Sequence, residues 1–530
     1  MSGAARGASP DAIVIGAGVN GLVAAATLAG RGARVLVLER SERIGGQGRP
    51  LEFAPGFRAV PLLRDGGWLP PRVARDLGLS GLERVVPDPT IAVPAGEREW
   101  LALSSDIGRT ADQIRRHSAR DAGRWSGFAA RIAALSGFLE TLYTAPPPDI
   151  AATALGELLS LLGVARKLRG LGRADMIELL RTVPMSVQEL LDDWFECDPL
   201  KAAIGGAGVA ELRQGPRSGG TAFLLLHHQV GAAPGALRGR GWWRPGPDAL
   251  VLAAESAARR LGVEIRTGAD VTRVPVSDER VTGVVLAGGE EIAAGLVLST
   301  ADPGRTFGLV DPVWLDPEFL LAIRNIKYRG SAAKVLYALD ALPEFPGLPD
   351  PPRTLAGTLT LARSLEELEK AADAAKYGRV SEHPAIELEI PTLRWPGLAP
   401  AGKHVLVAHV QWAPYALREA GWDAARRAAL GDAVTAAIDG VAPCFGERVV
   451  ARSVLAPPDL EAEYGLTEGA VTQGEMTLDQ ILFMRPVAGW ARYATPLEGL
   501  YLGGAGTHPG SGIPGGPGWL AARRALADRR

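Results

Sequence analysis

The N-terminal segment combines short apolar runs with a glycine-rich turn. Residues 12–15 form an apolar run typical of a strand, residues 21 to about 29 an Ala-rich helical pattern, and residues 34–38 a second strand. The turn between strand and helix reads Gly16-Ala17-Gly18-Val19-Asn20-Gly21. This order predicts a βαβ unit of ordinary length.

Helical spacing then dominates a long segment. From residue 110 to about 203, apolar residues recur at helical spacing with few strand signals, which predicts a helical insertion. Alternation returns at 263–266 and 281–286, followed by an apolar run at 295–299. We expect these later segments to form a small sheet that returns to the N-terminal domain.

The second half of the chain predicts another domain. Residues 332–339, 386–390 and 404–410 look like strands, and residues 423–438 like a helix, which together favour an α+β arrangement. A chain of 530 residues far exceeds a single hydrophobic core. Two packed units, built from segments distant in the sequence, are therefore expected.

Composition excludes several classes of protein. Hydrophobic residues make up 47%, charged residues 22%, and the formal net charge is -2, which is typical of a globular protein and gives no sign of a nucleic-acid partner. Cys197 and Cys444 are too far apart in sequence for a CxxC pair. We expect no metal site, because the seven histidines form no ligand motif.

The sequence also bears on location. Residues 1–10 lack the features of a secretory signal, and no apolar run approaches the ~20 residues of a bilayer span. These observations predict a cytoplasmic protein. The Arg-rich stretch from Arg166 to Arg173 lies on an amphipathic helical pattern, so either peripheral contact with a membrane surface or a solvated helix face is open.

The glycines of the first turn have distinct physical roles in a dinucleotide site. Gly16 permits the tight turn, Gly18 lets the backbone approach a pyrophosphate, and Gly21 lets the helix pack close to the strand. The helix N-terminus then presents amide donors to the phosphates. With a strand before it and a helix after it, the motif predicts dinucleotide binding.

The residues after the second strand favour FAD. Glu39 ends that strand, where a carboxylate can accept hydrogen bonds from both hydroxyls of an adenosine ribose and repels a 2′-phosphate. Gly45 and Gly46 follow, and their bare backbone can lie against the ribityl-phosphate of a flavin. We therefore predict an FAD site that includes Glu39, Arg40, Gly45 and Gly46.

Several motifs carry a family resemblance. Residues 12–46 resemble the N-terminal FAD signature of the phytoene desaturase and amine oxidase superfamily, and residues 499–510 resemble its second flavin-binding segment. Nearly the whole chain is similar to the subgroup typified by pyridine nucleotide-disulphide oxidoreductase domain-containing protein 2. The motifs of that subgroup lie at residues 220–228, 299–303, 411–415 and 478–486.

The resemblance implies an α/β fold with a Rossmann-like FAD-binding domain and a discontinuous α+β substrate domain that carries a helical insertion. The FAD-binding domain would comprise residues 1–105, 206–305 and 466–530. The substrate domain would comprise residues 106–205 and 306–465.

The same resemblance assigns the cofactor contacts. The adenosine end of FAD would lie on Gly16, Gly18, Gly21 and Glu39, with Val271 covering the adenine and the Gly45-Gly46 pair near the pyrophosphate. The isoalloxazine would meet the segment 504–516. Its expected contacts include Gly504, Pro514, Gly515 and Gly516, and the N-terminus of the helix that follows can face the N1–C2=O edge.

Four side chains are candidates for chemistry. His508 can bond the cofactor, move a proton or only shape a turn. His227 is expected to be a satisfied core histidine, with catalysis as the alternative. Lys334 can hold a water near flavin N5, as in some amine oxidases, although we expect it to face solvent. Glu475 can serve as a base but has no visible partner.

These observations predict an FAD-dependent dehydrogenase, desaturase or oxidase that moves a hydride from a substrate carbon to flavin N5. The substrate is expected to be a small or lipid-like molecule, with oxygen or a quinone as electron acceptor. One alternative is a redox-neutral double-bond isomerase that needs reduced flavin. Another is a protein that keeps FAD as structure and acts mainly by binding partners.

Overall fold

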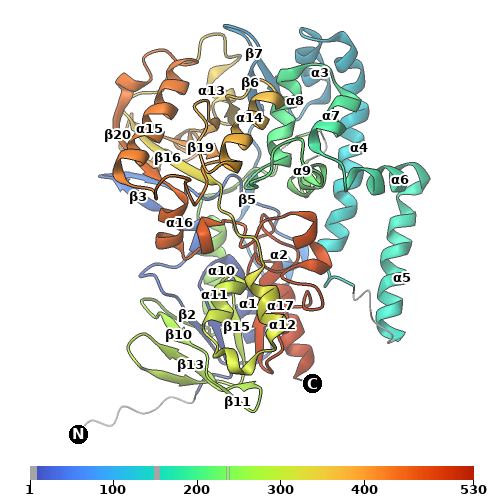
Figure 1. The fold of residues 1–530 in the computed structure, drawn as a ribbon, viewed down its shortest axis with the longest axis vertical. Coiled ribbons are helices and arrows are strands. Elements are labelled where there is room, and N and C mark those ends of the chain that lie inside the picture. Colours follow the sequence, from blue (N-terminus) through green and yellow to red (C-terminus); the bar gives the residue numbers. More distant parts are fainter. Residues whose placement is uncertain (1–8, 149–154, 234, 238, 530) are drawn as a thin grey trace.

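The computed structural model describes residues 9–148, 155–233, 235–237 and 239–529. Two large sheets organise the chain, one in each half of an elongated molecule (Figure 1). The first half contains the N-terminal βαβ unit, and the C-terminal helix lies beside it (Figure 1). Distant parts of the sequence therefore build one unit.

The sheet of the first half is fully parallel. Each neighbouring pair of its strands runs in the same direction, as expected for a doubly wound nucleotide-binding fold. Its strands, in spatial order, are β21 (Leu500–Leu502), β15 (Val297–Ser299), β1 (Ala12–Ile15), β2 (Val35–Leu38) and β9 (Glu264–Arg266).

Both faces of this sheet are covered. Ala12 and Val14 of β1 pack on one side, whereas Ile13 packs on the other, as the twofold alternation of a strand requires. The first face carries α1 (Val19–Ala29), α10 (Ala249–Arg260) and α17 (Gly516–Asp528). The second carries the antiparallel strands β10 (Val271–Arg273), β13 (Gly283–Leu286) and β14 (Glu291–Ala293), with helices α11 (Pro303–Gly308) and α12 (Pro317–Arg324).

The second half is built on a mixed sheet. Val335 and Tyr337 pack against α15 (Ala424–Asp439) in a buried core on one face of this sheet, while Lys334 and Leu336 point to the other face. Its strands, in spatial order, are β20 (Val449–Leu455), β16 (Ala332–Leu339), β19 (His404–Gln411), β18 (Ala385–Glu389), β17 (Thr358–Thr360), β6 (Ile91–Pro94) and β7 (Trp100–Leu103).

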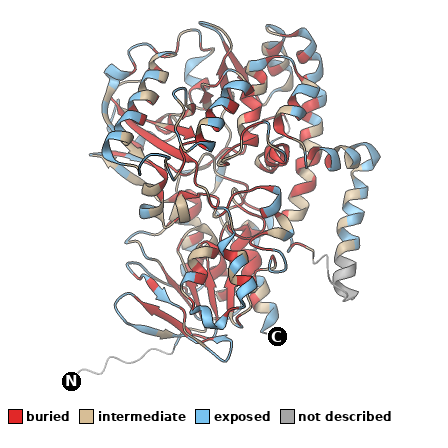
Figure 2. Cartoon of the chain, viewed as in Figure 1, coloured by how far each residue is buried: buried red, intermediate tan, exposed pale blue. Residues whose placement is uncertain are grey.

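A helical layer flanks the second sheet. Its core contains an aromatic cluster of Trp125, Phe128 and Phe195, all nearly inaccessible to solvent. Helix α5 projects away from the body, with mostly exposed side chains beyond residue 160 (Figures 1 and 2). The layer consists of α3 (Ile107–Arg115), α4 (Ala119–Tyr143), α5 (Leu155–Gly170), α6 (Gly172–Thr182), α7 (Val187–Trp194), α8 (Asp198–Gly205) and α9 (Thr221–Gln229).

Shorter elements complete the fold. Most of them cover the edges of the two sheets or connect them. They are α2 (Pro71–Asp76), α13 (Pro351–Thr354), α14 (Leu365–Lys376) and α16 (Pro457–Tyr464), with the strand pairs β3 (Leu51–Ala54) and β4 (Phe57–Ala59), β5 (Glu83–Val85) and β8 (Trp242–Arg244), and β11 (Val276–Ser277) and β12 (Arg280–Val281).

The predicted fold class is confirmed, and the predicted strands at 12–15, 332–339 and 404–410 match β1, β16 and β19 within a residue. The helical insertion is also present. The exact domain boundaries stay a prediction, and β6 and β7, which lie within residues 1–105, pair in the second sheet.

Candidate functional site

A cavity of about 420 Å³ lies at the carboxyl ends of β1 and β2 and reaches side chains near the second sheet. Its wall includes Gly16 and Glu39 from the first half, and Glu211 and Thr358 from the second. Ligands of open α/β sheets bind at the carboxyl ends of the strands. The position therefore fits a dinucleotide whose far end approaches the second sheet.

One end of the cavity is a cradle of bare backbone. Gly16 has a φ of +96°, and a Cβ on Gly21 would lie 1.9 Å from the Gly16 carbonyl oxygen. A Cβ on Gly46 would come within 3.2 Å of the Gly18 Cα, and the Gly18 and Gly45 backbones form an isolated bridge. Only glycines allow this approach, and the space that they leave fits a pyrophosphate.

The carboxylate next to the cradle is held in place by the backbone. Glu39 Oε2 accepts a hydrogen bond from the Ala17 amide at 2.8 Å, and Oε1 accepts one from the Ser41 amide at 2.9 Å. Each oxygen keeps a second lone pair for a ligand hydroxyl. Arg40 and Val271 stand in the same part of the wall.

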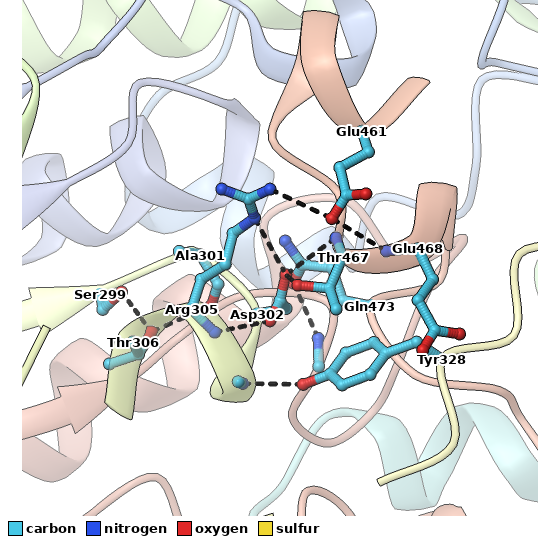
Figure 3. Close-up of polar contacts among 12 residues, drawn as sticks. Ser299, Ala301, Asp302, Arg305, Thr306, Tyr328, Glu461, Thr467, Glu468 and Gln473 are labelled. Atoms are coloured by element: carbon cyan, nitrogen blue, oxygen red, sulfur yellow. Dashed lines mark hydrogen bonds and ion pairs between the residues drawn. The ribbon is translucent and has the colours of Figure 1, made fainter. Parts of the chain in front are cut away.

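A buried network supports the wall at Thr300 and Ala301 (Figure 3). Asp302 caps α11 by accepting the Arg305 amide at 2.9 Å, and it also accepts the Thr467 hydroxyl at 2.8 Å. Gln473 donates to the Thr300 carbonyl at 3.1 Å and accepts the Gly506 amide at 2.9 Å. The network therefore fixes the strand end β15 to the C-terminal flavin segment.

The C-terminal segment contributes another stretch of wall. Residues 510–514 line the cavity, including Pro514. Gly504 lies behind the wall, since a Cβ there would meet the Thr300 carbonyl oxygen at 2.5 Å. The Gly515 amide donates to Asn20 Oδ1 at 2.8 Å, which joins α17 to α1.

The residues predicted to bind FAD thus fall into two sets. Those in the cavity wall are Gly16, Gly18, Glu39, Arg40, Gly45, Gly46, Val271 and Pro514. Those that pack behind the wall are Gly21, Gly504, Gly515 and Gly516. Direct contact with FAD stays a prediction for each of them.

Charged side chains form a row across three strands of the second sheet. The register pairs Lys334 of β16 with His409 of β19, and His409 with Glu387 of β18. Lys334 Nζ lies 3.3 Å from Glu211 Oε1 and hydrogen bonds to His409 Nδ1, and Arg64 closes the row by pairing with Glu387. The expectation that Lys334 faces solvent is wrong, because its side chain is fully buried by the layer over this face.

A neighbouring amide fixes the tautomer of His409. Gln411 Nε2 donates to the carbonyls of Val209 and Leu212 at 3.0 and 2.7 Å, so Gln411 Oε1 is the acceptor that faces His409 Nε2 at 3.1 Å. His409 therefore carries its proton on Nε2 and accepts from Lys334 at Nδ1. The same Gln411 Oε1 accepts the Glu211 amide at 3.1 Å.

Burial and mutual attraction set the protonation of this row. Burial would raise the pKa of Glu211, but the charge of Lys334 outweighs it and holds that pKa below its usual range. Burial lowers the pKa of Lys334, and burial with the Lys334 and Arg64 charges lowers the pKa of His409 to about 3. Glu211 is also held at a φ of +59°, a strained conformation that is common at functional sites.

The other three predicted catalytic residues lie in local hydrogen-bond networks. His227 Nε2 donates to the Ser511 carbonyl at 2.8 Å and Nδ1 accepts the Tyr143 hydroxyl at 2.8 Å. His508 Nε2 donates to the Leu142 carbonyl at 3.2 Å, and Glu475 accepts from Arg329 and from the Arg213 amide. Among the described residues that line the cavity none of the three appears, and their catalytic roles stay predictions.

Sequence reasoning missed four residues of the site: Arg64, Glu211, Arg240 and His409. Only His409 carried a usable signal, because His409 and Gln411 are polar residues at alternate positions of an otherwise apolar strand. Glu211 and Arg240 lie in connecting segments without a recognisable motif. Their importance follows from tertiary packing alone.

Comparison with known proteins then identifies the family. The profile of the NAD(P)-binding Rossmann-like domain matches residues 14–61, and that of the flavin containing amine oxidoreductase family matches residues 102–526. The chain belongs to the flavin containing amine oxidoreductase family. Its cofactor is FAD, which the glycine cradle and Glu39 fit, and it is an FAD-dependent oxidoreductase.

Relatives of this flavin containing amine oxidoreductase span nearly its full length. It is 36% identical to pyridine nucleotide-disulfide oxidoreductase domain-containing protein 2 of Rattus norvegicus, over 98% of this chain and 93% of the relative. It is 25% identical to a limonene dehydrogenase polypeptide of Castellaniella defragrans over 98% and 94%, and 22% identical to phytoene desaturase of Fusarium fujikuroi over 95% and 86%.

Solved structures confirm the amine oxidoreductase fold. An oxidoreductase from Methanosarcina mazei matches with a TM-score of 0.59 and 16% identity, over 97% of this chain and 99% of that one. Putrescine oxidase bound to putrescine matches with a TM-score of 0.58 and 16% identity, over 98% of both chains. Likeness at this level of identity establishes the fold alone.

Neither a metal site nor a membrane-spanning helix is found in the described ranges. Within them, no group of three or more His, Cys, Asp or Glu side chains is arranged to hold a metal ion. No helix in those ranges has both the length and the hydropathy of a membrane span.

The glycine cradle generates a first prediction. Gly21→Ala should lower both the FAD content and the free energy of unfolding, by about 2 kcal/mol or more, because the added Cβ collides with the Gly16 carbonyl. FAD absorbance per protein and urea unfolding measure the two effects. Gly123→Ala on α4, where nothing lies within 4 Å of the new Cβ, is the control and should leave both unchanged or raise stability slightly. Normal FAD content in Gly21→Ala would contradict the assignment.

Buried histidines generate a second prediction. Burial lowers the pKa of His227 and His409 to about 3 and of His508 to about 4, against about 6.5 in an unfolded chain. Between about pH 6.5 and 5 only the unfolded chain takes up these protons. The free energy of unfolding should therefore fall with pH, by up to about 1.4 kcal/mol per pH unit for each histidine.

Urea unfolding from about pH 7 to 5 measures this slope. His227→Gln should reduce the slope by about a third, since it removes one of the three titrating groups. His383→Gln, at an exposed histidine, is the matched control. Equal slopes in the two variants would show that His227 does not titrate in this way.

Proposed function

We propose that the protein is an FAD-dependent dehydrogenase that oxidises a carbon–hydrogen bond of a small hydrophobic substrate. The observation that carries the proposal is the continuity of one cavity from the glycine cradle to Glu211 beside the buried Lys334. When bound, FAD supplies a hydride acceptor at N5. Oxygen or a quinone would then accept the electrons.

The walls of the cavity support a hydrophobic substrate. Apolar side chains contribute much of the surface between the two sheets, and a few polar groups interrupt it, which is the usual composition of a small-molecule site. The apolar contributors are Leu62, Leu63, Ala207, Ala210, Leu466, Val471 and Ile513.

The names of the relatives point in the same direction. Limonene dehydrogenase and phytoene desaturase both carry the names of hydrocarbons and of dehydrogenation. A hydrocarbon offers no group for strong hydrogen bonding, so positioning must come from the shape of an apolar cavity. We extend this substrate class to the present chain as part of the proposal.

Glu211 is the residue that we assign to the proton. Dehydrogenation between two carbons removes a hydride, which the cofactor takes, and a proton, which needs a base. The Glu211 carboxylate lies in the cavity wall and is kept ionised by Lys334. Lys334 and His409 then hold the carboxylate in position instead of contacting the substrate.

Substrate-dependent flavin reduction tests this function. Anaerobic mixing with terpenes, carotenoid precursors, unsaturated acids and amines should bleach the oxidised flavin band, near about 450 nm, with a hydrocarbon. Bleaching by amines alone would contradict the substrate class. Turnover that requires reduced flavin and consumes no acceptor would instead establish a redox-neutral isomerase, and a flavin that no compound bleaches would favour partner binding.

The base is tested with an isosteric variant. Glu211→Gln should slow flavin reduction by the active compound by about 100-fold or more, because the amide cannot accept the proton. The FAD content should stay normal. Glu290→Gln, which removes a surface carboxylate paired with Arg266, is the control. An unchanged rate in Glu211→Gln would exclude Glu211 as the base.

Peripheral membrane contact also stays a proposal. Arg166, Lys167 and Arg169 are exposed on the projecting helix α5, and Leu162 on the same helix is 63% exposed. Such a surface is compatible with a lipid headgroup layer and equally with a solvated arm.

A further inference from the structure

Arg240 is a buried cation with no carboxylate partner among the described residues. Its side chain is 1% exposed, and its guanidinium donates to the carbonyls of Val230 at 3.2 Å, Gly512 at 3.3 Å and His227. No carboxylate oxygen of the described residues lies within 4 Å of its nitrogens. A buried charge of this kind is costly unless something compensates for it.

Arg485 shows what a purely structural buried arginine looks like in this protein. It is 2% exposed and also lacks a carboxylate partner in the described ranges, but its three nitrogens donate to five carbonyls and it stands apart from the described cavity wall. Those carbonyls belong to Thr472, Gly474, Glu475, Gln480 and Ala505. Arg240 has three such contacts for its five N–H groups, and it lines the cavity.

Arg240 lies toward the flavin end of the cavity. It reaches the wall from the side of α9 and touches Gly512 in the C-terminal segment, where a Cβ would lie 2.4 Å from its Nη1. The cradle and Glu39 hold the adenosine end at the first sheet. FAD bound along this cavity would therefore place its ring toward Arg240 and the second sheet.

The helix N-terminus near this segment has few donors left to serve a ligand. The Gly515 amide donates to Asn20, the Gly516 amide donates to the Ile513 carbonyl at 3.1 Å, and Pro517 has no N–H. We expected this helix end to stabilise negative charge on the flavin. The cation beside it is better placed to do so.

We propose that Arg240 compensates the negative charge that the flavin gains on two-electron reduction, so that the reduced cofactor takes up one proton instead of two. The charge balance is complete: two electrons and one proton enter the flavin, and the remaining negative charge is met by the guanidinium. This inference rests on the FAD site and requires no particular substrate, so it survives if the proposed reaction is wrong.

The groups around Arg240 keep a net positive charge there. Burial raises the pKa of Tyr143 far above its usual value, and burial with the Arg240 charge lowers the pKa of His227 to about 3, so both neighbours are neutral near pH 7. Arg84, which donates to the Arg240 carbonyl, adds a second cation. Asp65 in the cavity wall is the nearby carboxylate, and its Oδ1 accepts the Gly67 amide at 2.8 Å.

The midpoint potential of the FAD-loaded protein, measured against pH with reference dyes, tests the proposal. Uptake of one proton with two electrons gives a slope of about 30 mV per pH unit, and uptake of two protons gives about 59 mV. Wild-type protein should follow the shallower slope between about pH 5 and 6.5. Arg240→Met should have a lower potential and approach the steeper slope.

Two further variants complete the test. Arg240→Lys keeps the charge and should keep the shallow slope, whereas Arg244→Met, at an exposed arginine paired with Glu83, should behave as wild type. An unchanged potential and slope in Arg240→Met would overturn the proposal, and would leave a substrate carboxylate as the anion that Arg240 meets. If Arg240→Met does not retain FAD, a slope of about 59 mV per pH unit in the wild type overturns it on its own.

Discussion

Contact between bare backbone segments is the constraint on which the architecture depends. A Cβ on Gly21 would lie 1.9 Å from the Gly16 carbonyl, and a Cβ on Gly518 would lie 2.0 Å from the Asn20 carbonyl. The first contact shapes the phosphate turn, and the second joins the C-terminal helix to the N-terminal one. Because these contacts need glycine, the two ends of a long chain meet at the cofactor site and bring the flavin segment to it.

The second sheet adds charge where a fold would ordinarily bury apolar groups. Lys334, His409 and Glu211 satisfy one another, and Gln411 fixes their hydrogen-bond directions. Removing one member would leave a buried charge unpaired, so such clusters weigh against stability unless all partners are present. Their position beside a cofactor cavity explains why the fold would retain them, since perturbed charges cluster at functional sites.

Local patterns predicted the first half of the site well and the second half poorly. The turn around Gly16 and the carboxylate of Glu39 are set by residues adjacent in sequence, so a strand, a turn and a helix suffice to predict them. Lys334 gave the opposite result, because the alternation of a strand does not say which face is covered. The row that it forms with His409 depends on strand register, and Glu211 and Arg240 are brought in by long connections that carry no motif.

A crystal structure of the FAD-bound protein would test the central claim most directly. The account predicts adenosine against Glu39, the pyrophosphate on the Gly18 and Gly46 backbone, and the flavin ring between Arg240 and the face of the second sheet that carries Glu211 and Lys334. A ring turned away from the second sheet, or FAD bound outside this cavity, would contradict it.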